Sequence, residues 1–292
     1  MRSKRNIRLV LSYDGTDFGG WQRQRNARSV QGELERALER MHGHHVPTLG
    51  AGRTDSGVHA MGQVANFFTD IASIEARRFL PALNKLMARD VRVLAASDAD
   101  FDFHSRYDAR LRRYRYFILC SPSPDPMRLR YCHHIRRRPS LAALNSAAGM
   151  ILGERDFTSF SSAKDESASR WRCVTESSFR WEGDALVYEI AANAFLWRMV
   201  RSLVGSLVHF EAECARGGAT DLVGAVSERM ARVLSLRERS LSGPTAPAHG
   251  LFLWNVEYYP NPTRPGRGDY WTVADGAAPE SGPRLVPGIG LV

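Results

Sequence analysis

One acidic side chain in this sequence is set in a context that suits catalysis. Asp55 lies in the run AGRTDSGVHA (residues 51–60), with Arg53 two residues before it and His59 four residues after it. The glycines on either side of the acid permit backbone angles and close approaches that other residues resist. A loop of this kind can press a carboxylate against a bulky ligand. A plain tight turn is the alternative, because Asp and Gly are both common in turns.

The composition favours a polyanionic partner. The 292 residues are 43% hydrophobic and 24% charged, which is enough for one large domain or two of ordinary size. Lys and Arg number 40 against 31 Asp and Glu, for a formal net charge of +9. Nearly all of the basic residues are Arg, whose planar fork of donors suits phosphates and base edges. Nucleic acid is the simplest partner for this charge, and an ordinary basic protein is the alternative.

Nothing in the sequence indicates a metal site, a disulfide framework or a membrane span. The four cysteines are scattered without a Cys-x-x-Cys pair, which argues against a zinc site and against disulfides. No apolar run approaches the length of a membrane span, and the start MRSKRNIRLVLSYDG has no cleavage site. We therefore expect a soluble cytoplasmic protein without a metal. The histidines that could suggest one fit no ordinary zinc spacing: His42, His44, His45, His133 and His134.

Apolar spacing in the first hundred residues predicts the order strand, helix, strand, strand, helix, strand. Ser29 is a suitable N-cap and Gly43 a suitable stop for the first helix, whereas Pro81 should kink or shorten the second. This order is that of the split βαβ, or ferredoxin-like, plan. It places the Asp55 loop between the two middle strands, at the edge or end of a sheet. The expected ranges are 7–13, 30–41, 46–49, 63–69, 74–86 and 91–96.

The second half mixes antiparallel strands with longer helices, and a hairpin should turn at Glu182-Gly183-Asp184. We expect strands at 111–119, 173–181, 185–192 and 251–258 and helices at 141–152, 195–213 and 219–234. The predicted fold is α+β, with two ferredoxin-like (split βαβ) domains whose mostly antiparallel sheets can run together. The N-terminal domain with the Asp55 loop spans 1–104 and the C-terminal α+β domain spans 105–260. Residues 261–292 should form a flexible tail, because they are dense in Pro and Gly and lack apolar periodicity.

With these segments in place, the chain resembles the bacterial tRNA pseudouridine synthase A family, the TruA type. Seven motifs carry the resemblance, in order and at compatible spacing: YDGTDFGGWQRQ, RSVQGELERAL, AGRTDSGVHAMGQV, FHSRYDARLRRYRY, GERDFTSF, NAFLWRMVRSLVGSL and HGLFL. The chain departs from the usual family pattern at Ser56, at Leu86-Met87 and at the bulkier run Leu196-Trp197-Arg198. The resemblance implies isomerisation of uridine to pseudouridine at positions 38, 39 and 40 in the anticodon stem-loop of tRNA. It also implies a homodimer that needs no cofactor.

The resemblance assigns roles to single residues. Asp55 corresponds to the essential carboxylate that acts on a flipped-out uridine, as a nucleophile or as a base. Arg201 corresponds to the partner that keeps Asp55 ionised through a charge-assisted pair. Tyr114 corresponds to the ring that stacks on the uracil, and Leu251 to an apolar wall of the pocket. Arg53 corresponds to the side chain that fills the gap left by the base. From the pattern alone, a solvated helix face for Arg201 and core positions for Tyr114 and Leu251 are the alternatives.

Arginines and tyrosines alternate along the strand predicted at 111–119 and the segment before it. Positive charge interleaved with aromatic rings suits a folded RNA. A packed face of tyrosines and a solvated face of arginines is the alternative. The basic stripe comprises Arg106, Arg110, Arg112, Arg113 and Arg115, with Tyr107, Tyr114 and Tyr116 between them. From this stripe and the Asp55 loop, the residues expected to bind RNA are Arg53, Arg106, Arg110 and Arg112.

Two other functions are open at this point. A non-catalytic RNA-binding module would share the fold and the charge, but it has little use for a fixed acid such as Asp55, which repels phosphates. A serine hydrolase would need a Gly-x-Ser-x-Gly elbow, and Ser202 and Ser206 each have a valine where the first glycine should be. We therefore expect an RNA-modifying enzyme that depends on Asp55.

Overall fold

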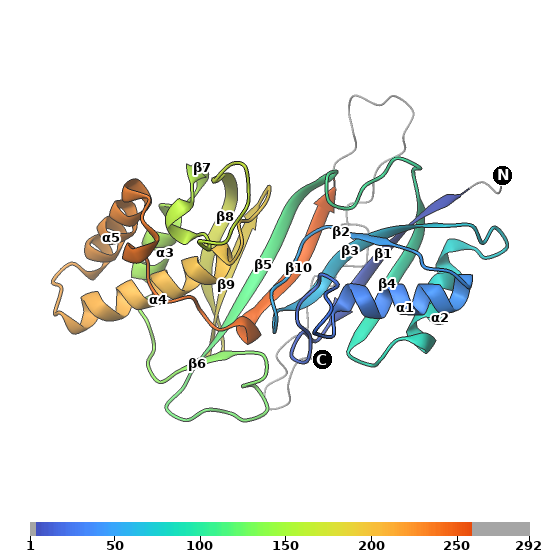
Figure 1. Cartoon of the computed structure of the whole chain (residues 1–292). Helices are drawn as coiled ribbons and strands as arrows, with labels where there is room; N and C mark the ends of the chain where they lie inside the picture. Colours follow the sequence, from blue (N-terminus) through green and yellow to red (C-terminus); the bar gives the residue numbers. More distant parts are fainter. Residues whose placement is uncertain (1–3, 259–292) are drawn as a thin grey trace. The chain divides into compact units, whose positions relative to one another are not determined.

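The structure is a computed structural model that describes residues 4–258, drawn in colour in Figure 1. Within this part the chain forms two compact units. The first contains the residues up to Arg112 together with the segment from Phe252, and the second contains Arg113–Leu251. Both units combine helices with mostly antiparallel strands, which confirms the predicted α+β class.

The first unit has the predicted order of strands and helices. Its elements are β1 (Arg5–Tyr13), α1 (Val30–His42), β2 (Thr48–Gly50), β3 (His59–Thr69), a 3-10 helix (Ala76–Arg78), α2 (Phe79–Leu86), β4 (Val91–Ala99) and β10 (Leu251–Tyr258). The strands follow the order β4-β1-β3-β10, and β2 pairs with β3. β1 is antiparallel to both β3 and β4, whereas β10 is parallel to β3. The loop with Asp55 leads from β2 into β3, as expected.

Local signals set the ends of the two helices in this unit. The Ser29 side chain accepts a hydrogen bond from the Gly32 N–H at 3.3 Å, and Gly43 ends α1 with a φ of 75°, so both predicted caps are confirmed. α2 begins at Phe79 and has Pro81 in its first turn, where a missing N–H costs no helical hydrogen bond. Pro81 has therefore shortened the helix, as predicted, relative to the range 74–86.

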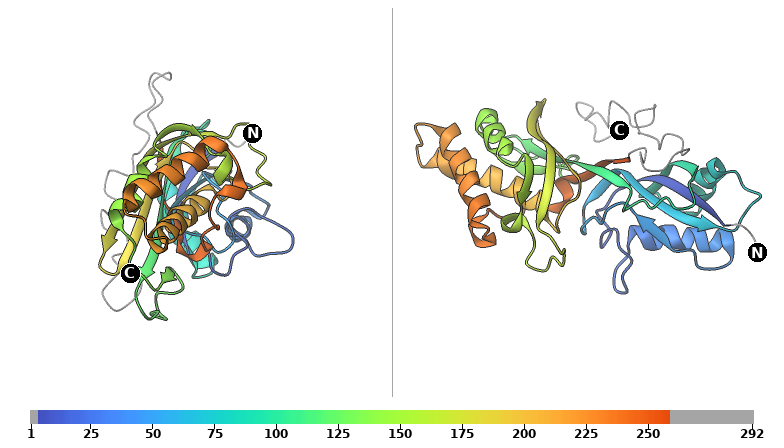
Figure 2. Two further views of the ribbon diagram at one scale, coloured as in Figure 1. Left: turned by 90° about the vertical axis from the view of Figure 1, so that its left-hand side faces the viewer. Right: turned by 90° about the horizontal axis from the view of Figure 1, so that it is seen from above.

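The second unit packs its helices on one side of its strands (Figures 1 and 2). Its strands follow the order β5-β9-β8-β7, and β6 pairs in parallel with β5. The predicted hairpin joins β8 to β9 at Gly183, whose φ is 64°. The elements are β5 (Ala109–Cys120), β6 (His133–Ile135), α3 (Leu141–Gly149), β7 (Gly153–Asp156), β8 (Trp171–Glu182), β9 (Ala185–Ala192), α4 (Met199–Arg216) and α5 (Leu222–Leu236), with 3-10 helices at Thr158–Phe160, Arg239–Leu241 and Ala248–Gly250.

Each unit has its own apolar core. In the first, alternate residues of β1 are fully buried, namely Ile7, Leu9 and Leu11, which is the period of two that places side chains on one face of a strand. In the second, β9 is buried along almost its whole length, which is typical of a strand in a sheet covered on both faces. These cores make each unit a firm support for the loops at its strand ends.

Some observed boundaries differ from those predicted. α3 ends at Gly149, and Gly153 opens β7 with a φ of 84° instead of ending the helix. α4 begins at Met199, because hydrogen bonds from the segment around Asp165 hold the residues before it in a loop. Residues 105–112 and 252–258, which the sequence placed in the C-terminal domain, belong to the first unit. The tail predicted at 261–292 lies outside the described residues.

Candidate active site

The Asp55 loop is a turn anchored between two strands. Residues 51–58 connect β2 to β3, and the Val58 N–H donates to the Asp55 carbonyl at 3.1 Å. Gly57 has a left-handed φ of 77°, which glycine adopts without a steric cost. Asp55 is half-buried, and Arg53 in the same loop is exposed. The loop is therefore a tight turn, and it also presents a carboxylate.

The segment after β1 covers one side of the Asp55 loop. The Trp21 N–H donates to the Thr54 carbonyl at 3.1 Å, and the Ser56 hydroxyl donates to the Phe18 carbonyl at 3.1 Å. Trp21 and Phe18 are each 2% exposed, so their rings anchor this segment in the core. Two motifs that are separate in the sequence, YDGTDFGGWQRQ and AGRTDSGVHAMGQV, are thereby in direct contact.

Gly20 lies where these two segments pass closely. Its φ is 101°, and a Cβ built on it would lie 2.5 Å from the Thr54 carbonyl oxygen. Gly20→Ala should therefore strain the backbone and lower the free energy of unfolding by about 2 kcal/mol, measured by thermal or urea unfolding. Gly149→Ala is the control, because a Cβ there would meet nothing within 4 Å. Equal unfolding free energies for the two variants would show that the contact is not tight.

Side chains from β1 and β3 hold the loop from the strand side. The Tyr13 hydroxyl lies 2.9 Å from the Thr54 hydroxyl in a buried hydrogen bond. The Gln63 side-chain amide donates to the Gly52 carbonyl at 2.8 Å. Two residues just before Asp55 are therefore bonded to the sheet, which restricts where its carboxylate can lie.

His59 braces the turn after β1. It is 1% exposed, and its Nδ1 accepts a hydrogen bond from the Gly15 N–H at 3.0 Å. Its ring stacks on Phe252 with 4.6 Å between ring centroids. A buried imidazole held by a backbone donor and a stacked ring positions the start of β3, from which the Asp55 loop departs.

Arg112 ties the Asp55 loop to the segment before β5. It is 9% exposed, and its guanidinium donates to the Ala109 carbonyl at 2.9 Å, to the Arg106 carbonyl at 2.6 Å and to the Ala51 carbonyl at 3.0 Å. A buried guanidinium is tolerated when its donors find acceptors in this way. Arg112 is therefore a brace between two segments, and the RNA contact predicted for it stays a prediction.

The second unit carries the remaining predicted site residues. Arg201 lies in the first turn of α4 and is half-buried. Tyr114 on β5 is 7% exposed and packs edge-on against Phe195, with 5.1 Å between ring centroids. Leu251 is 5% exposed at the start of β10. Because these three residues and Asp55 belong to different units, the pairing of Arg201 with Asp55 stays a prediction.

The arginines of the basic stripe do not share one environment. Arg113 forms ion pairs with Glu176 and Glu189, and Arg115 pairs with Glu189. Burial alone would raise the pKa of Glu189, but the guanidinium groups of Arg115 and Arg113 outweigh it and hold that pKa below its usual value. The continuous basic surface predicted from the sequence is therefore interrupted here. By contrast, Arg106 and Arg110 are exposed.

Comparison with known proteins decides the family. The family model described as tRNA pseudouridine synthase matches residues 9–108 and 147–259. A tRNA pseudouridine synthase A from Treponema denticola is 46% identical over 262 residues, which cover 88% of this chain and 94% of the relative. The chain belongs to the tRNA pseudouridine synthase A family. As a member of this family it is an enzyme, an isomerase.

Other relatives of the same name are also similar over most of their length. The tRNA pseudouridine synthase A of Acetivibrio thermocellus is 37% identical and aligns over 87% of this chain and 100% of its own. That of Halalkalibacterium halodurans is 41% identical, over 85% of this chain and 90% of its own. A solved structure described as a Cbf5-Nop10-Gar1 complex has a TM-score of 0.26 and 9% identity, which is too weak a likeness to support any argument about this synthase.

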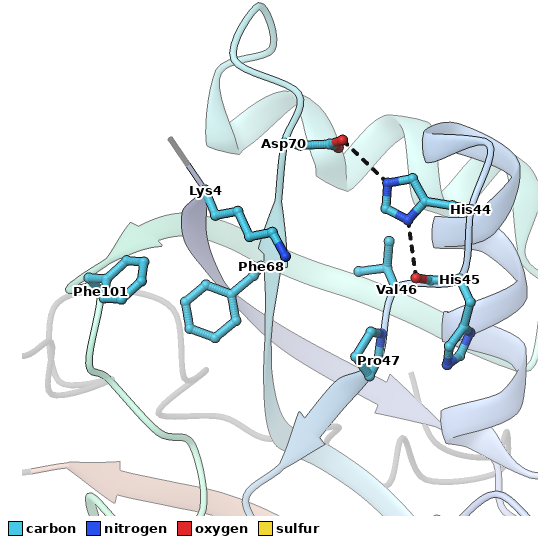
Figure 3. Close-up of a pocket in the computed structure, with 8 residues that line it drawn as sticks. All are labelled: Lys4, His44, His45, Val46, Pro47, Phe68, Asp70 and Phe101. Atoms are coloured by element: carbon cyan, nitrogen blue, oxygen red, sulfur yellow. Dashed lines mark hydrogen bonds and ion pairs between the residues drawn. The ribbon is translucent and has the colours of Figure 1, made fainter. Parts of the chain in front are cut away.

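A surface pocket in the first unit contains none of the predicted site residues (Figure 3). It has a volume of about 360 Å³. His44 and Asp70 form an ion pair at 3.3 Å, and the hydrogen bonds of His44 to the His45 carbonyl and to Asp70 raise the pKa of His44. Asp70 follows the last residue of β3, whereas the Asp55 loop enters β3 at its first. The pocket is lined by Lys4, His44, His45, Val46, Pro47, Phe68, Asp70 and Phe101.

The described residues offer neither a cluster of metal ligands nor a membrane-spanning helix. Within residues 4–258, no group of three or more His, Cys, Asp or Glu side chains is arranged to hold a metal ion. In the same part of the chain, no helix combines the length and apolar character needed to cross a membrane. The four cysteines are free thiols in the structure, and burial raises the pKa of Cys120 and of Cys132 to about 11.

Two positioning interactions in this synthase were not predicted from the sequence. One is the set of carbonyl contacts made by Arg112. The other is at Asp165, whose carboxylate accepts the Trp197 N–H and pairs with Arg170 at 2.9 Å. An acid next to a motif is a common surface feature, and no spacing signal distinguishes Asp165 from other loop acids. A buried arginine in a basic stripe is equally hard to distinguish before the fold is known.

Proposed function

We propose that this enzyme isomerises uridine to pseudouridine at positions 38, 39 and 40 in the anticodon stem-loop of tRNA, with Asp55 as the essential carboxylate. The observation that supports this most strongly is the braced loop: in a member of this family, a half-buried acid directly follows residues bonded to β1, to β3 and to Arg112. Functional groups need support of this kind if they are to be held in a productive geometry. A surface acid needs none.

The reaction breaks the N1–C1′ bond of uridine, turns the freed uracil and joins C5 to C1′. Uracil loses the proton from C5 and gains one at N1, so the atoms balance without a cofactor. A base stacked in a helix cannot turn, and the enzyme must therefore extract it and hold it in a pocket. Asp55 acts on the ribose, either as a nucleophile at C1′ or as a base.

We assign supporting roles to four further residues. Arg201 pairs with Asp55 and keeps it ionised. Tyr114 stacks on the extruded uracil, an interaction worth about 1–3 kcal/mol per base, and Leu251 forms an apolar wall beside it. Arg53, exposed in the same loop as Asp55, enters the gap that the base leaves in the RNA.

The finer architecture and the assembly are part of the same proposal. The order β4-β1-β3 with β2 on the other edge of β3 supports a ferredoxin-like plan for the first unit, and we extend this plan to the second. We propose that two chains form a homodimer that acts in the cytoplasm, as the family resemblance implies. Light scattering of the purified protein would measure the assembly directly.

Exposed arginines of the first unit supply the RNA contacts in this proposal. Arg53, Arg106 and Arg110 are exposed, and the Arg106 guanidinium carbon lies 5.9 Å from the centroid of the Tyr107 ring. Arg106→Gln should weaken tRNA binding and reduce the slope of log Kd against log salt concentration by about one, because one phosphate contact is lost. Anisotropy titrations at several salt concentrations measure this slope.

Arg40→Gln provides the matched control for that titration. Arg40 is also exposed in the first unit, in the last turn of α1, and its loss changes the net charge equally. We expect the Arg40→Gln slope to equal that of the wild type. A single slope shared by wild type, Arg106→Gln and Arg40→Gln would show that Arg106 does not contact the RNA.

Mapping of pseudouridine in an unmodified tRNA transcript, before and after addition of the purified protein, tests the proposed function. We expect pseudouridine at positions 38, 39 and 40 wherever the transcript has uridine. A transcript with cytidine at all three positions should stay unmodified. Pseudouridine in another arm of the tRNA, or none at all, would overturn the assignment to the anticodon stem-loop.

Neither a non-catalytic RNA-binding module nor a serine hydrolase gains support. Family membership makes the chain an enzyme, which argues against a non-catalytic RNA-binding module. The serines considered for a hydrolase lie inside α4, where Ser202 and Ser206 are buried and the Ser206 hydroxyl donates to the Ser202 carbonyl at 2.7 Å. A nucleophile must be reachable by its substrate, so neither serine suits hydrolysis.

A further inference from the structure

The loop before α4 holds Trp197 by its backbone. Its N–H donates to the Asp165 carboxylate, and its carbonyl accepts from the Ser162 N–H at 2.9 Å. The Asp165 side chain is 4% exposed and also pairs with Arg170 at 2.9 Å. These bonds use the main chain of Trp197, so a different side chain at this position would not remove them.

The Asp165 carboxylate is a stable part of this loop near neutral pH. Burial alone would raise the pKa of Asp165, but hydrogen bonds from the N–H groups of Trp197 and Ser167 outweigh it and hold that pKa below its usual value. The Asp165 carboxylate therefore stays ionised, and its oxygens continue to accept these hydrogen bonds. Trp197 is accordingly presented by a firm loop.

The side chains of Trp197 and Arg198 are nevertheless exposed to solvent. Trp197 is 41% exposed, and the Arg198 guanidinium carbon lies 5.5 Å from the centroid of its ring. Arg198 has a φ of 63°, which is uncommon for a residue with a side chain and costs conformational energy. Such strain is concentrated at functional sites.

Positive charge at this loop is not neutralised. In residues 4–258, no carboxylate lies within ion-pair distance of Arg198. Arg239 is close enough that Arg198, after the larger effect of burial, lowers its pKa. An arginine beside an exposed indole, with a second arginine close to the first, attracts an anion that carries an aromatic group more strongly than it attracts an apolar protein surface.

We propose that Trp197 and Arg198 bind one unpaired nucleotide of the substrate RNA next to the target uridine. The Trp197 ring stacks on the base, and the Arg198 guanidinium pairs with the phosphate. This inference rests on the proposed function, since Arg201, the proposed partner of Asp55, lies only three residues after Arg198 in the first turn of α4. Stacking of bases on aromatic rings beside arginine is the usual way in which proteins hold single-stranded RNA.

Binding and kinetics on an anticodon-arm RNA test the stacking. Trp197→Ala should raise the Kd about tenfold and slow isomerisation at sub-saturating enzyme by the same factor, whereas Trp197→Phe should retain most of the affinity. The same measurement is then made on RNAs that carry one abasic nucleotide at each loop position in turn. The penalty of Trp197→Ala should vanish for one of these positions, because the stacked base is then already missing.

Arg198→Gln and Arg216→Gln form a charge-matched pair for the phosphate contact. Arg216 is exposed at the opposite end of α4, roughly 27 Å away for 18 residues at about 1.5 Å each. Arg198→Gln should reduce the salt slope of binding by about one, and Arg216→Gln should leave it unchanged.

Specific outcomes would overturn the inference. One is an equal loss of affinity for Trp197→Ala on every abasic RNA, and another is an unchanged Kd for this variant on the intact RNA. A changed oligomeric state without a change in RNA affinity would show that the indole contacts protein instead. In each case the wild type still forms pseudouridine, so the proposed function stands. Failure of the wild type to modify tRNA would overturn the proposed function itself.

Discussion

Asp55→Asn should abolish pseudouridine formation and leave tRNA binding intact. The amide keeps the size of the side chain and its loop, but it can neither attack C1′ nor accept a proton from the ribose. Loss of an acid–base group lowers rates by about 10²–10⁴-fold, and loss of a nucleophile should lower them further. The Kd for tRNA should be unchanged or lower, because the variant removes negative charge from a surface that binds phosphates. Nucleoside analysis and anisotropy titrations give the two quantities.

Asp17→Asn is the matched control for this variant. Asp17 is exposed in the segment that covers the Asp55 loop, and the substitution removes the same charge. We expect wild-type activity from Asp17→Asn. Asp55→Glu should also be strongly impaired, since one added methylene displaces the carboxylate from a loop that cannot adjust. Activity in Asp55→Asn equal to that of Asp17→Asn would remove Asp55 from the mechanism.

Arg112→Met should destabilise the first unit and slow the reaction together. The three carbonyls that Arg112 satisfies, those of Ala51, Arg106 and Ala109, would lose their donor in a buried place. Unsatisfied buried groups cost about 1–3 kcal/mol each, so we expect the free energy of unfolding to fall by about 3 kcal/mol. Release of Ala51 also frees the start of the Asp55 loop, and a displacement of about 1 Å lowers rates by about 10²-fold.

Arg110→Met is the control variant that separates a role of Arg112 in positioning the Asp55 loop from a role in binding RNA. Arg110 is exposed two residues before Arg112, so its loss should raise KM for tRNA while kcat and the unfolding free energy stay unchanged. Arg112→Met should instead lower kcat, with a smaller change in KM. Arg112→Lys should recover only part of the loss, because an ammonium lacks the planar fork that reaches three carbonyls. A pure KM effect in Arg112→Met would assign it to RNA contact.

Much of the fold could be predicted because its signals are local. Ser29 and Gly43 cap α1 through bonds that involve neighbouring residues only, and Gly183 closes the hairpin for the same reason. The start of α4 could not be predicted this way. Its apolar spacing begins at Phe195, but the loop bonds from Asp165 and Ser162 delay the start of the helix to Met199. These partners are more than thirty residues away.

The candidate site could be predicted in part for a related reason. The glycines around Asp55 are a local sign of a tight loop, and the loop is where it was expected. The role of Arg112 depends on Ala51, 61 residues earlier in the chain, and the environment of Arg113 depends on Glu176 on another strand. Charge patterns in one segment therefore predict which arginines are present, but only the fold shows which of them are already paired.

The central claim is that the Asp55 carboxylate performs the isomerisation of an anticodon-arm uridine. Its most direct test is a single-turnover reaction with excess enzyme on a tRNA whose anticodon-arm uridines are individually resolved, for wild type and Asp55→Asn at matched occupancy. We expect the wild type to convert the uridines at positions 38, 39 and 40 and the bound variant to convert none. Conversion by Asp55→Asn at the wild-type rate would contradict this claim.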